Sequence, residues 1–117
     1  MNFEVQLLKK SILIVDDDEA LSESIKEVLA SRGFQNIHVA YSISEGINVF
    51  SVSHIDLIIL DVMLPDGEGY LLSEYVRESS DVPILFLTAW IVKLSAYFPR
   101  RILHKVFSSQ DIFVAYY

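Results

Sequence analysis

The chain has 117 residues, of which 52% are hydrophobic, and its nine basic and sixteen acidic residues give a net charge of −7. This length and apolar content suit one domain with a packed core, and the acidic balance argues against direct nucleic-acid binding by this chain, which requires a basic face. The absence of cysteine excludes disulfides and thiolate metal sites and is compatible with a reducing, cytoplasmic setting. The first residues lack the pattern of a signal peptide, and no apolar run reaches the roughly 20 residues that cross a bilayer.

The first half of the chain alternates between strand-like and helix-like segments. Residues 11–15 are short, β-branched and uninterrupted, which predicts a strand covered on both faces. A helix follows and ends at Gly33, where a left-handed residue is wanted. Residues 37–40 predict a second strand, and Ser42 or Ser44 is expected to cap the next helix. The inward residues are Leu21, Ile25, Val28 and Leu29 in the first helix and Ile43, Ile47 and Phe50 in the second.

The second half begins with the same alternation. Residues 57–60 predict a third strand and residues 64–67 a turn. A helix then carries an apolar stripe, and residues 82–88 predict a fourth strand that is entered through Pro83. The stripe consists of Leu71, Leu72, Tyr75 and Val76. The weaker patterns that follow indicate a helix over 90–98, a fifth strand over 102–104 and a short helix over 108–117.

Repeated strand–helix units with short links predict an α/β fold: a doubly wound, five-stranded parallel sheet with helices on both faces. A single domain is expected over residues 1–117, with residues 1–10 as an N-terminal extension and an atypical C-terminal third. In such sheets the functional site lies beyond the carboxyl ends of the strands. Asp16, Asp17, Asp61 and Thr88 all fall at that edge.

Acidic residues end two of the apolar runs. Asp16, Asp17 and Asp18 follow the first strand, and Asp61 follows the third. Ionised carboxylates that gather at one edge of a sheet repel each other unless a cation lies among them. Oxygen ligands without nearby His or Cys suit a hard ion, so the pattern predicts a Mg²⁺ site. Asp18 is expected to cap a helix rather than to bind the metal, Asp66 and Gly67 to form a turn, and the three histidines to bind no metal.

In their order along the chain, these motifs resemble the receiver domain of bacterial two-component response regulators, a flavodoxin-like, CheY-like fold. The resemblance covers about residues 10–89. It rests on the paired acids after the first strand, on Asp61-Val62-Met63-Leu64-Pro65-Asp66-Gly67, which is similar to the phosphorylation-site loop, and on Val82-Pro83-Ile84-Leu85-Phe86-Leu87-Thr88-Ala89, which is similar to the fourth strand.

The resemblance implies that Asp61 accepts a phosphoryl group from a phosphohistidine of a sensor histidine kinase. Asp16, Asp17, Asp61 and the backbone carbonyl of Met63 would bind Mg²⁺. Thr88 and a late lysine would contact phosphoryl oxygens and switch an output surface. Residues 64–67 and 82–84 also look like those of receivers that are attached to winged-helix DNA-binding domains, which implies a role in transcription.

The chain departs from the family pattern after Ala89. Lys105-Val106-Phe107 corresponds to the usual Lys-Pro-Phe, but the interval from Thr88 is shorter, Val106 replaces the proline and Ile102 replaces a switching aromatic residue. Either a deletion or altered reading frame has remodelled this region, or Lys93 or Lys105 contacts the phosphoryl group in an unusual geometry. The apolar residues near the C-terminus predict a dimer or a swapped assembly through the C-terminal third.

Two other functions fit the same residues. A receiver-like interaction domain that no longer switches would explain the altered C-terminal third. A phosphatase of the haloacid-dehalogenase type would explain Asp16-Asp17-Asp18 at a strand end, but such enzymes need a longer chain and a later acidic pair. The expectation is therefore a phospho-accepting signalling domain and not an enzyme, with slow self-dephosphorylation at most.

Overall fold

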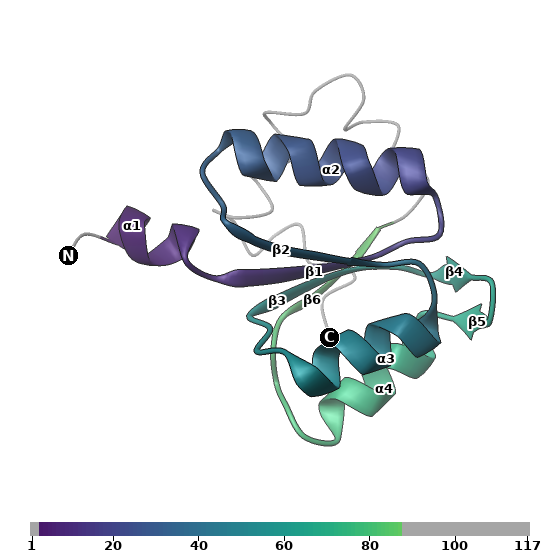
Figure 1. The fold of residues 1–117 in the computed structure, drawn as a ribbon. Coiled ribbons are helices and arrows are strands. Elements are labelled where there is room, and N and C mark those ends of the chain that lie inside the picture. The colour runs from purple at the N-terminus through teal and green to yellow at the C-terminus, as the bar shows by residue number, and fades with distance from the viewer. Residues whose placement is uncertain (1–2, 88–117) are drawn as a thin grey trace.

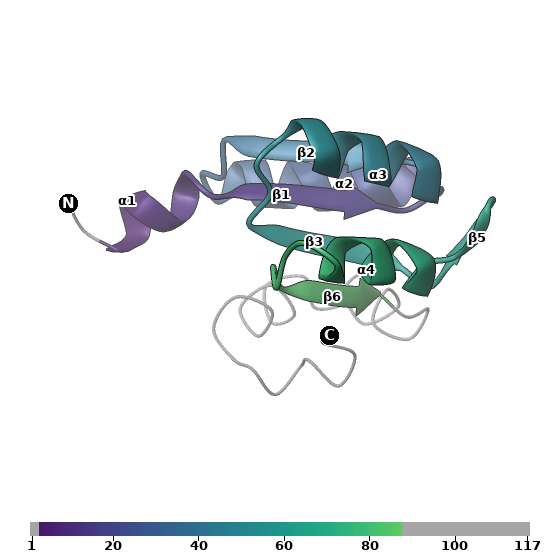
Figure 2. The ribbon, with the colours of Figure 1, turned by 90° about the horizontal axis from the view of Figure 1, so that it is seen from below.

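A four-stranded parallel sheet with helices on both faces forms the centre of the structure, a computed structural model that describes residues 3–87 (Figure 1). The strands lie in the order β2-β1-β3-β6, which Figure 2 shows from one side. Their bounds are β1 Ser11–Val15, β2 Asn36–Ala40, β3 Leu57–Asp61 and β6 Ile84–Leu87. All three pairings are parallel, so the predicted α/β doubly wound fold is confirmed for these residues.

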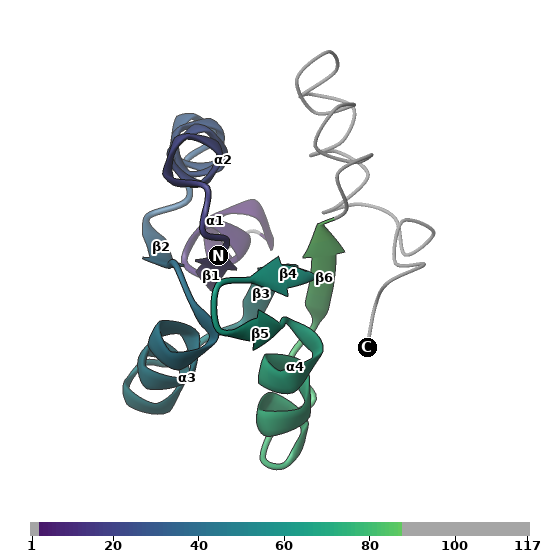
Figure 3. The same ribbon diagram turned by 90° about the vertical axis from the view of Figure 1, so that its right-hand side faces the viewer.

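The helices form two layers. On one face lies α2 (Glu19–Ser31), and on the other lie α3 (Ile43–Val52) and α4 (Tyr70–Arg77), as Figures 1 and 3 show. Alternate residues of β1 face these two layers: Leu13 and Val15 pack with the α3–α4 side, whereas Ile12 and Ile14 pack with the α2 side. Burial on both faces explains why the strands are continuous apolar runs rather than alternating ones.

The helix ends follow the capping rules that the sequence suggested. Asp18 is the N-cap of α2, because its carboxylate accepts a hydrogen bond from the Leu21 amide at 3.0 Å. Ser42, and not Ser44, is the N-cap of α3, with its hydroxyl accepting from the Glu45 amide at 3.1 Å. Gly33 has φ +100°, the left-handed conformation that was predicted after α2.

The element boundaries shift in three places. Strand β6 begins after Pro83, which has no amide to donate; its carbonyl instead accepts from the Ile58 amide at 3.0 Å. Strand β3 includes Asp61 rather than ending before it. The predicted turn at 64–67 is the connection of a small antiparallel hairpin, β4 (Met63–Leu64) with β5 (Gly67–Glu68).

One helix was not predicted: α1 (Phe3–Leu8) lies in the expected N-terminal extension. Six residues are too few to show a helical period, so the pattern gave no signal. Leu7 and Leu8 pack against the α2 side of the core, and the Leu8 carbonyl accepts from the Gln35 amide at 3.4 Å. The extension therefore adds apolar cover to the fold.

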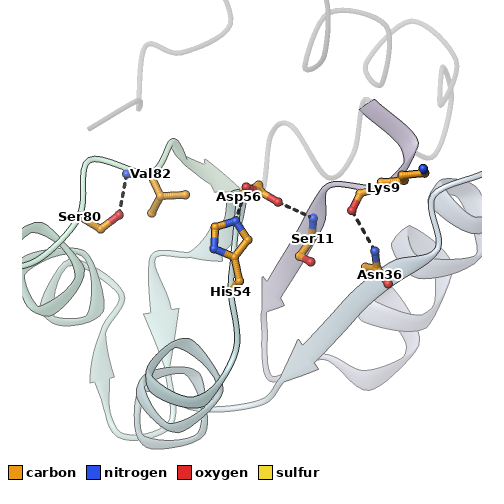
Figure 4. A network of polar contacts seen from close by, with 7 residues as sticks. All are labelled: Lys9, Ser11, Asn36, His54, Asp56, Ser80 and Val82. Atoms are coloured by element: carbon orange, nitrogen blue, oxygen red, sulfur yellow. Dashed lines mark hydrogen bonds and ion pairs between the residues drawn. The ribbon is translucent and has the colours of Figure 1, made fainter. Parts of the chain in front are cut away.

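Polar contacts tie together the loops at the amino ends of the strands (Figure 4). Asp56 accepts from the Ser11 amide and contacts the His54 ring, both at 2.8 Å, while its own amide donates to the Ser11 carbonyl. The Asn36 side chain donates to the Lys9 carbonyl at 2.9 Å. His54 is thus engaged at the sheet edge opposite the acidic residues, and neither it nor His38 belongs to the acidic cluster.

The remaining predictions concern residues outside the described range. They are the helix over 90–98, the strand over 102–104 and the helix over 108–117, together with Thr88, Lys93, His104 and Lys105. Over residues 3–87, none of the helices has the length and apolar character that crossing a membrane requires.

Candidate functional site

Three carboxylates meet at the carboxyl edge of the sheet. Strands β1 and β3 are neighbours, and Val15 pairs with Leu60, so the next residues, Asp16 and Asp61, lie side by side. Asp17 follows directly. Each of the three offers a carboxylate oxygen, and these oxygens all lie within 4.8 Å of one another. The parallel sheet therefore brings together the three acids that the sequence placed at this edge.

Asp16 is the innermost of the three, with 2% of its surface exposed. Its amide donates to the Ala40 carbonyl at 3.1 Å, its carbonyl accepts from the Ser22 hydroxyl at 3.2 Å, and its carboxylate accepts from the Asp18 amide at 2.9 Å. Burial raises the pKa of Asp16 to about 6 and is the largest cause of the shift. The hydrogen bond from the Asp18 amide lowers this pKa, and the negative charges of the acidic neighbours raise it further.

Asp61 lies at the end of β3 and is half-buried. The Met63 amide donates to its Oδ1 at 3.3 Å. Desolvation is the main cause of a raised pKa for Asp61, and the charge of Asp17 adds to it; hydrogen bonds from the Met63 and Val62 amides and from the Asp16 side chain act in the opposite direction. The free energy of the cluster is thus lowest when a proton or a cation reduces its negative charge.

The donor set fits Mg²⁺. All three side chains offer oxygen, and Mg²⁺ binds oxygen at about 2.1 Å, so ligands on opposite sides of the ion are about 4.2 Å apart. The carboxylate oxygens of the cluster lie within 4.8 Å of one another, which is compatible with that span. Asp17 is exposed and leaves the site open to solvent on one side. Met63, whose backbone carbonyl is the fourth predicted ligand, is the first residue of β4, and its amide contacts Asp61.

The acidic neighbours Asp18 and Asp66 have other roles. Asp18 caps α2, as expected. Asp66 does more than turn the chain: its two carboxylate oxygens accept from the Ile43 and Ser44 amides at the start of α3, at 2.9 and 3.0 Å. Its partners lie 22 and 23 residues earlier in the sequence, so local pattern could not reveal the contact. The only local signal was an aspartate in a Pro-Asp-Gly turn.

Gly69 is a second residue whose role the sequence did not indicate. A Cβ atom at this position would collide with the backbone carbonyl oxygen of Asp61. The Gly69 amide donates to the Val62 carbonyl at 2.6 Å. The start of α4 therefore lies directly against the end of β3, and only a residue without a side chain fits there.

Comparison with known proteins agrees with this geometry. The model of the response regulator receiver domain matches residues 12–114. The chain belongs to this family. The receiver match extends through most of the C-terminal third, whose sequence departs from the usual motifs.

Curated relatives of the receiver are named as regulators of transcription. The transcriptional regulatory protein YvrH of Bacillus subtilis is 48% identical over 79 residues, which cover 68% of this chain and 33% of that protein. DltR of Streptococcus agalactiae is 34% identical over 79 residues, covering 67% of this chain and 35% of that protein. The chain thus spans about a third of the length of the curated relatives it matches.

Solved receiver structures share the fold. The non-phosphorylated HemR receiver domain from Leptospira biflexa is 38% identical, with a TM-score of 0.64 over 80% of this chain and 76% of that one. The MaeR response regulator bound to beryllium trifluoride is 28% identical, with a TM-score of 0.64 over 68% of this chain and 67% of that one. Both support the identification as a two-component signalling domain.

Proposed function

We propose that this receiver accepts a phosphoryl group on Asp61 from the phosphohistidine of a sensor histidine kinase and that Mg²⁺ is its cofactor. The observation that carries the proposal is the convergence of Asp16, Asp17 and Asp61 at the ends of two adjacent strands. A carboxylate oxygen of Asp61 forms the new bond to phosphorus, the phosphorus–nitrogen bond breaks, and its electron pair stays on the histidine nitrogen.

The chain supplies positioning rather than covalent machinery, as phosphoryl transfer requires. Asp16, Asp17, Asp61 and the Met63 carbonyl would bind the ion, which when bound neutralises charge on the phosphoryl oxygens. Asp16 is fixed by three hydrogen bonds, one to the Ala40 carbonyl at the end of β2, one from the Ser22 hydroxyl in α2 and one from the Asp18 amide, so it offers a preformed ligand. Asp61 is oriented by the Met63 amide, which leaves its other oxygen for the incoming phosphorus.

The signal would leave through residues beyond the described range. A phosphoryl group adds a charge of about −1.5 to −2 and strong hydrogen-bond acceptors. We propose that Thr88 contacts one of its oxygens, that Lys105 contacts another, and that their movement favours one of two loop arrangements. We propose that contact with DNA falls to residues outside this chain and that the protein acts in the cytoplasm. The names of the relatives support an output in transcription.

Labelling with a small-molecule phosphodonor and Mg²⁺, followed by intact mass, tests the proposal. The parent chain should gain one phosphoryl group, and Asp61→Asn should gain none. Asp18→Asn is the matched control, because it changes a neighbouring acid that caps α2 and should keep full labelling. Labelling of Asp61→Asn to the same extent as the parent would refute the assignment.

The same experiment separates receiver chemistry from catalytic turnover. We propose that labelling is stoichiometric and slow to reverse, so that phosphodonor consumption stops at about one equivalent. Continuous release of phosphate from an ester would instead favour the hypothesis that the chain is a phosphatase. Labelling without any change in elution volume or in amide chemical shifts would favour a receiver that no longer switches.

A further inference from the structure

The acceptor loop, defined here as residues 61–69, leaves the sheet and returns to α4. Within it, Met63 pairs with Glu68 and Leu64 with Gly67, so the loop is a two-stranded hairpin (Figure 3). Asp66 lies at the tip. Gly67 has φ +143°, a conformation that side-chain-bearing residues rarely adopt. The hairpin gives the loop a defined shape, so the position of its tip affects the position of its base.

Asp66 joins this tip to α3. Its Oδ1 accepts from the Ile43 amide at 2.9 Å and its Oδ2 from the Ser44 amide at 3.0 Å. The first amides of a helix have no partner within the helix, and the Ser42 hydroxyl accepts from the Glu45 amide. The bonds from Ile43 and then Ser44 lower the pKa of Asp66, so the carboxylate is ionised at neutral pH.

Helix α3 is a fixed anchor for this contact. A Cβ atom on Gly46 would lie 2.9 Å from Leu72 Cδ2 and 3.3 Å from Val15 Cγ2, so α3 packs closely against both α4 and β1. Ile43, one of the two residues that donate to Asp66, is itself buried in the core. Because Asp16 and Asp17 directly follow β1, the anchor keeps a constant position relative to two of the three acids.

The base of the acceptor loop lies beside Asp61. The Met63 amide donates to Asp61 Oδ1 at 3.3 Å, and the Gly69 amide donates to the Val62 carbonyl at 2.6 Å. Met63 is largely exposed, with 65% of its surface open to solvent, so its side chain contributes little to fixing the loop. The orientation of Met63 therefore depends on the hairpin and on what fixes the hairpin tip.

We propose that Asp66 is a positioning residue for phosphoryl transfer: by binding the acceptor loop to the start of α3, it keeps the Met63 backbone in place beside Asp61. This inference rests on the proposed function. Without the Asp66 carboxylate the hairpin loses these two hydrogen bonds to α3, and Met63 samples positions in which its amide no longer orients Asp61 and its carbonyl would no longer reach the ion. The acceptor then spends less time in the reactive geometry.

The test compares Asp66→Ala and Asp66→Asn with the parent in phosphodonor labelling with saturating Mg²⁺. Small misplacements of reacting groups cost large factors in rate, and we expect Asp66→Ala to lower the saturating rate about 10- to 100-fold. The phosphodonor concentration at half rate should stay within about twofold, since both carboxylate oxygens of Asp66 are already bound to amides of α3. Asp66→Asn keeps one acceptor oxygen and should give an intermediate rate.

Glu45→Gln is the matched control. Glu45 lies in the first turn of the same helix and accepts from the Tyr41 amide at 2.8 Å. The Glu45→Gln substitution removes one negative charge, as the Asp66 variants do, so it controls for the change in electrostatic field. It should label at the parent rate. The amide NMR signals of Asp61 and Met63 should shift in both Asp66 variants and not in Glu45→Gln.

Each outcome has a distinct meaning. A parent chain that gains no phosphoryl group overturns the proposed function itself. A parent that labels on Asp61 while Asp66→Ala labels at the same rate overturns only the positioning role. Equal slowing in Glu45→Gln also overturns that role, because helix capping would then be the cause. If Asp66→Ala does not fold, Asp66→Asn decides the question, with its folded fraction measured by circular dichroism.

Discussion

At the scale of single residues, the acidic cluster lowers the stability of the fold and at the same time forms a binding site. Asp16 is buried among apolar strand ends, and its pKa is raised to about 6 because desolvation disfavours the ionised form. The negative charges of Asp17 and Asp61 act in the same direction. Such a site costs free energy of folding in the absence of a cation, and it recovers part of that cost when a cation binds.

Removing one of these charges should therefore stabilise the metal-free protein. In EDTA at pH 7, we expect Asp17→Asn to raise the melting temperature by roughly 4 °C, the shift that about 1 kcal/mol produces in a domain of this size. Added Mg²⁺ should stabilise the parent more than the variant. Asp18→Asn is the control and should respond to Mg²⁺ as the parent does. A melting temperature that ignores both Mg²⁺ and Asp17→Asn would contradict the metal site.

The raised pKa of Asp16 also sets a pH dependence. Below pH 3.8 the carboxyl is protonated in both the unfolded and the folded chain, and it costs nothing. Between pH 3.8 and about 6 the unfolded chain loses its proton more readily, so the free energy of unfolding falls as the pH rises; above about 6 the loss is complete. Asp61 shifts in the same direction.

Thermal unfolding in EDTA from pH 4 to pH 7 measures this effect as a difference between Asp16→Asn and the parent. The stability advantage of the variant should grow up to about pH 6 and then remain constant. Asp56 does not interfere. Desolvation is the largest influence on the pKa of Asp56 and raises it, but the hydrogen bonds with Ser11 and His54 leave this pKa lowered overall. Asp56 therefore changes the free energy of unfolding only below pH 3.8. A constant difference across this range would contradict the raised pKa of Asp16.

At the scale of elements, the connection from β3 to α4 is the most constrained part of the site. Gly69→Ala would place a Cβ atom against the Asp61 carbonyl oxygen, a backbone atom that cannot move without moving the acceptor. We expect a loss of about 1–3 kcal/mol in the free energy of unfolding, measured in urea, together with slower labelling.

Gly46→Ala provides the comparison for this substitution. Its Cβ atom would meet the ends of the Leu72 and Val15 side chains, which shift more readily than a backbone carbonyl, and alanine adds about 1 kcal/mol of helix propensity over glycine. The net change in stability should therefore be smaller than for Gly69→Ala, and the labelling rate should stay close to that of the parent. Equal effects of the two substitutions would contradict the special role of the Asp61 contact.

The elements were predictable where one physical signal dominates. Residues 11–15 and 57–60 read as strands because both faces are buried, and Ser42 and Asp18 as caps because their side chains bind nearby amides. The short helix α1 and the β4–β5 hairpin were missed, since six- and two-residue elements show no period. The contact of Asp66 with α3 joins residues 22 and 23 positions apart, which only the folded chain reveals.

At the scale of the whole molecule, the predicted site followed from topology. Parallel strands place all their carboxyl ends at one edge, so acids after β1 and β3 had to approach each other once these strands became neighbours. No such constraint exists for the roles of Lys93 and Lys105, because the departures after Ala89 remove the motif that aligns them.

Self-association is a property of the whole molecule that strand β6 and the sequence after it suggest. Among the strands in the described part of the chain, β6 pairs with β3 alone. The C-terminal segment is rich in apolar residues, namely Ile112, Phe113, Val114, Tyr116 and Tyr117. Apolar residues of this kind favour association where they are exposed. We therefore expect a dimer or a swapped assembly through the C-terminal third.

Light scattering coupled to size-exclusion chromatography checks this expectation over a range of protein concentrations. The parent should elute with the mass of a dimer, and Phe113→Lys should shift it to a monomer, because a buried apolar contact would have to accept a charge. Val52→Lys is the matched control: Val52 is an exposed apolar residue on α3, with 74% of its surface open, and its substitution should leave the dimer intact. A parent that stays monomeric at high concentration would refute the assembly, and a dimer that only Val52→Lys dissociates would move the interface to α3.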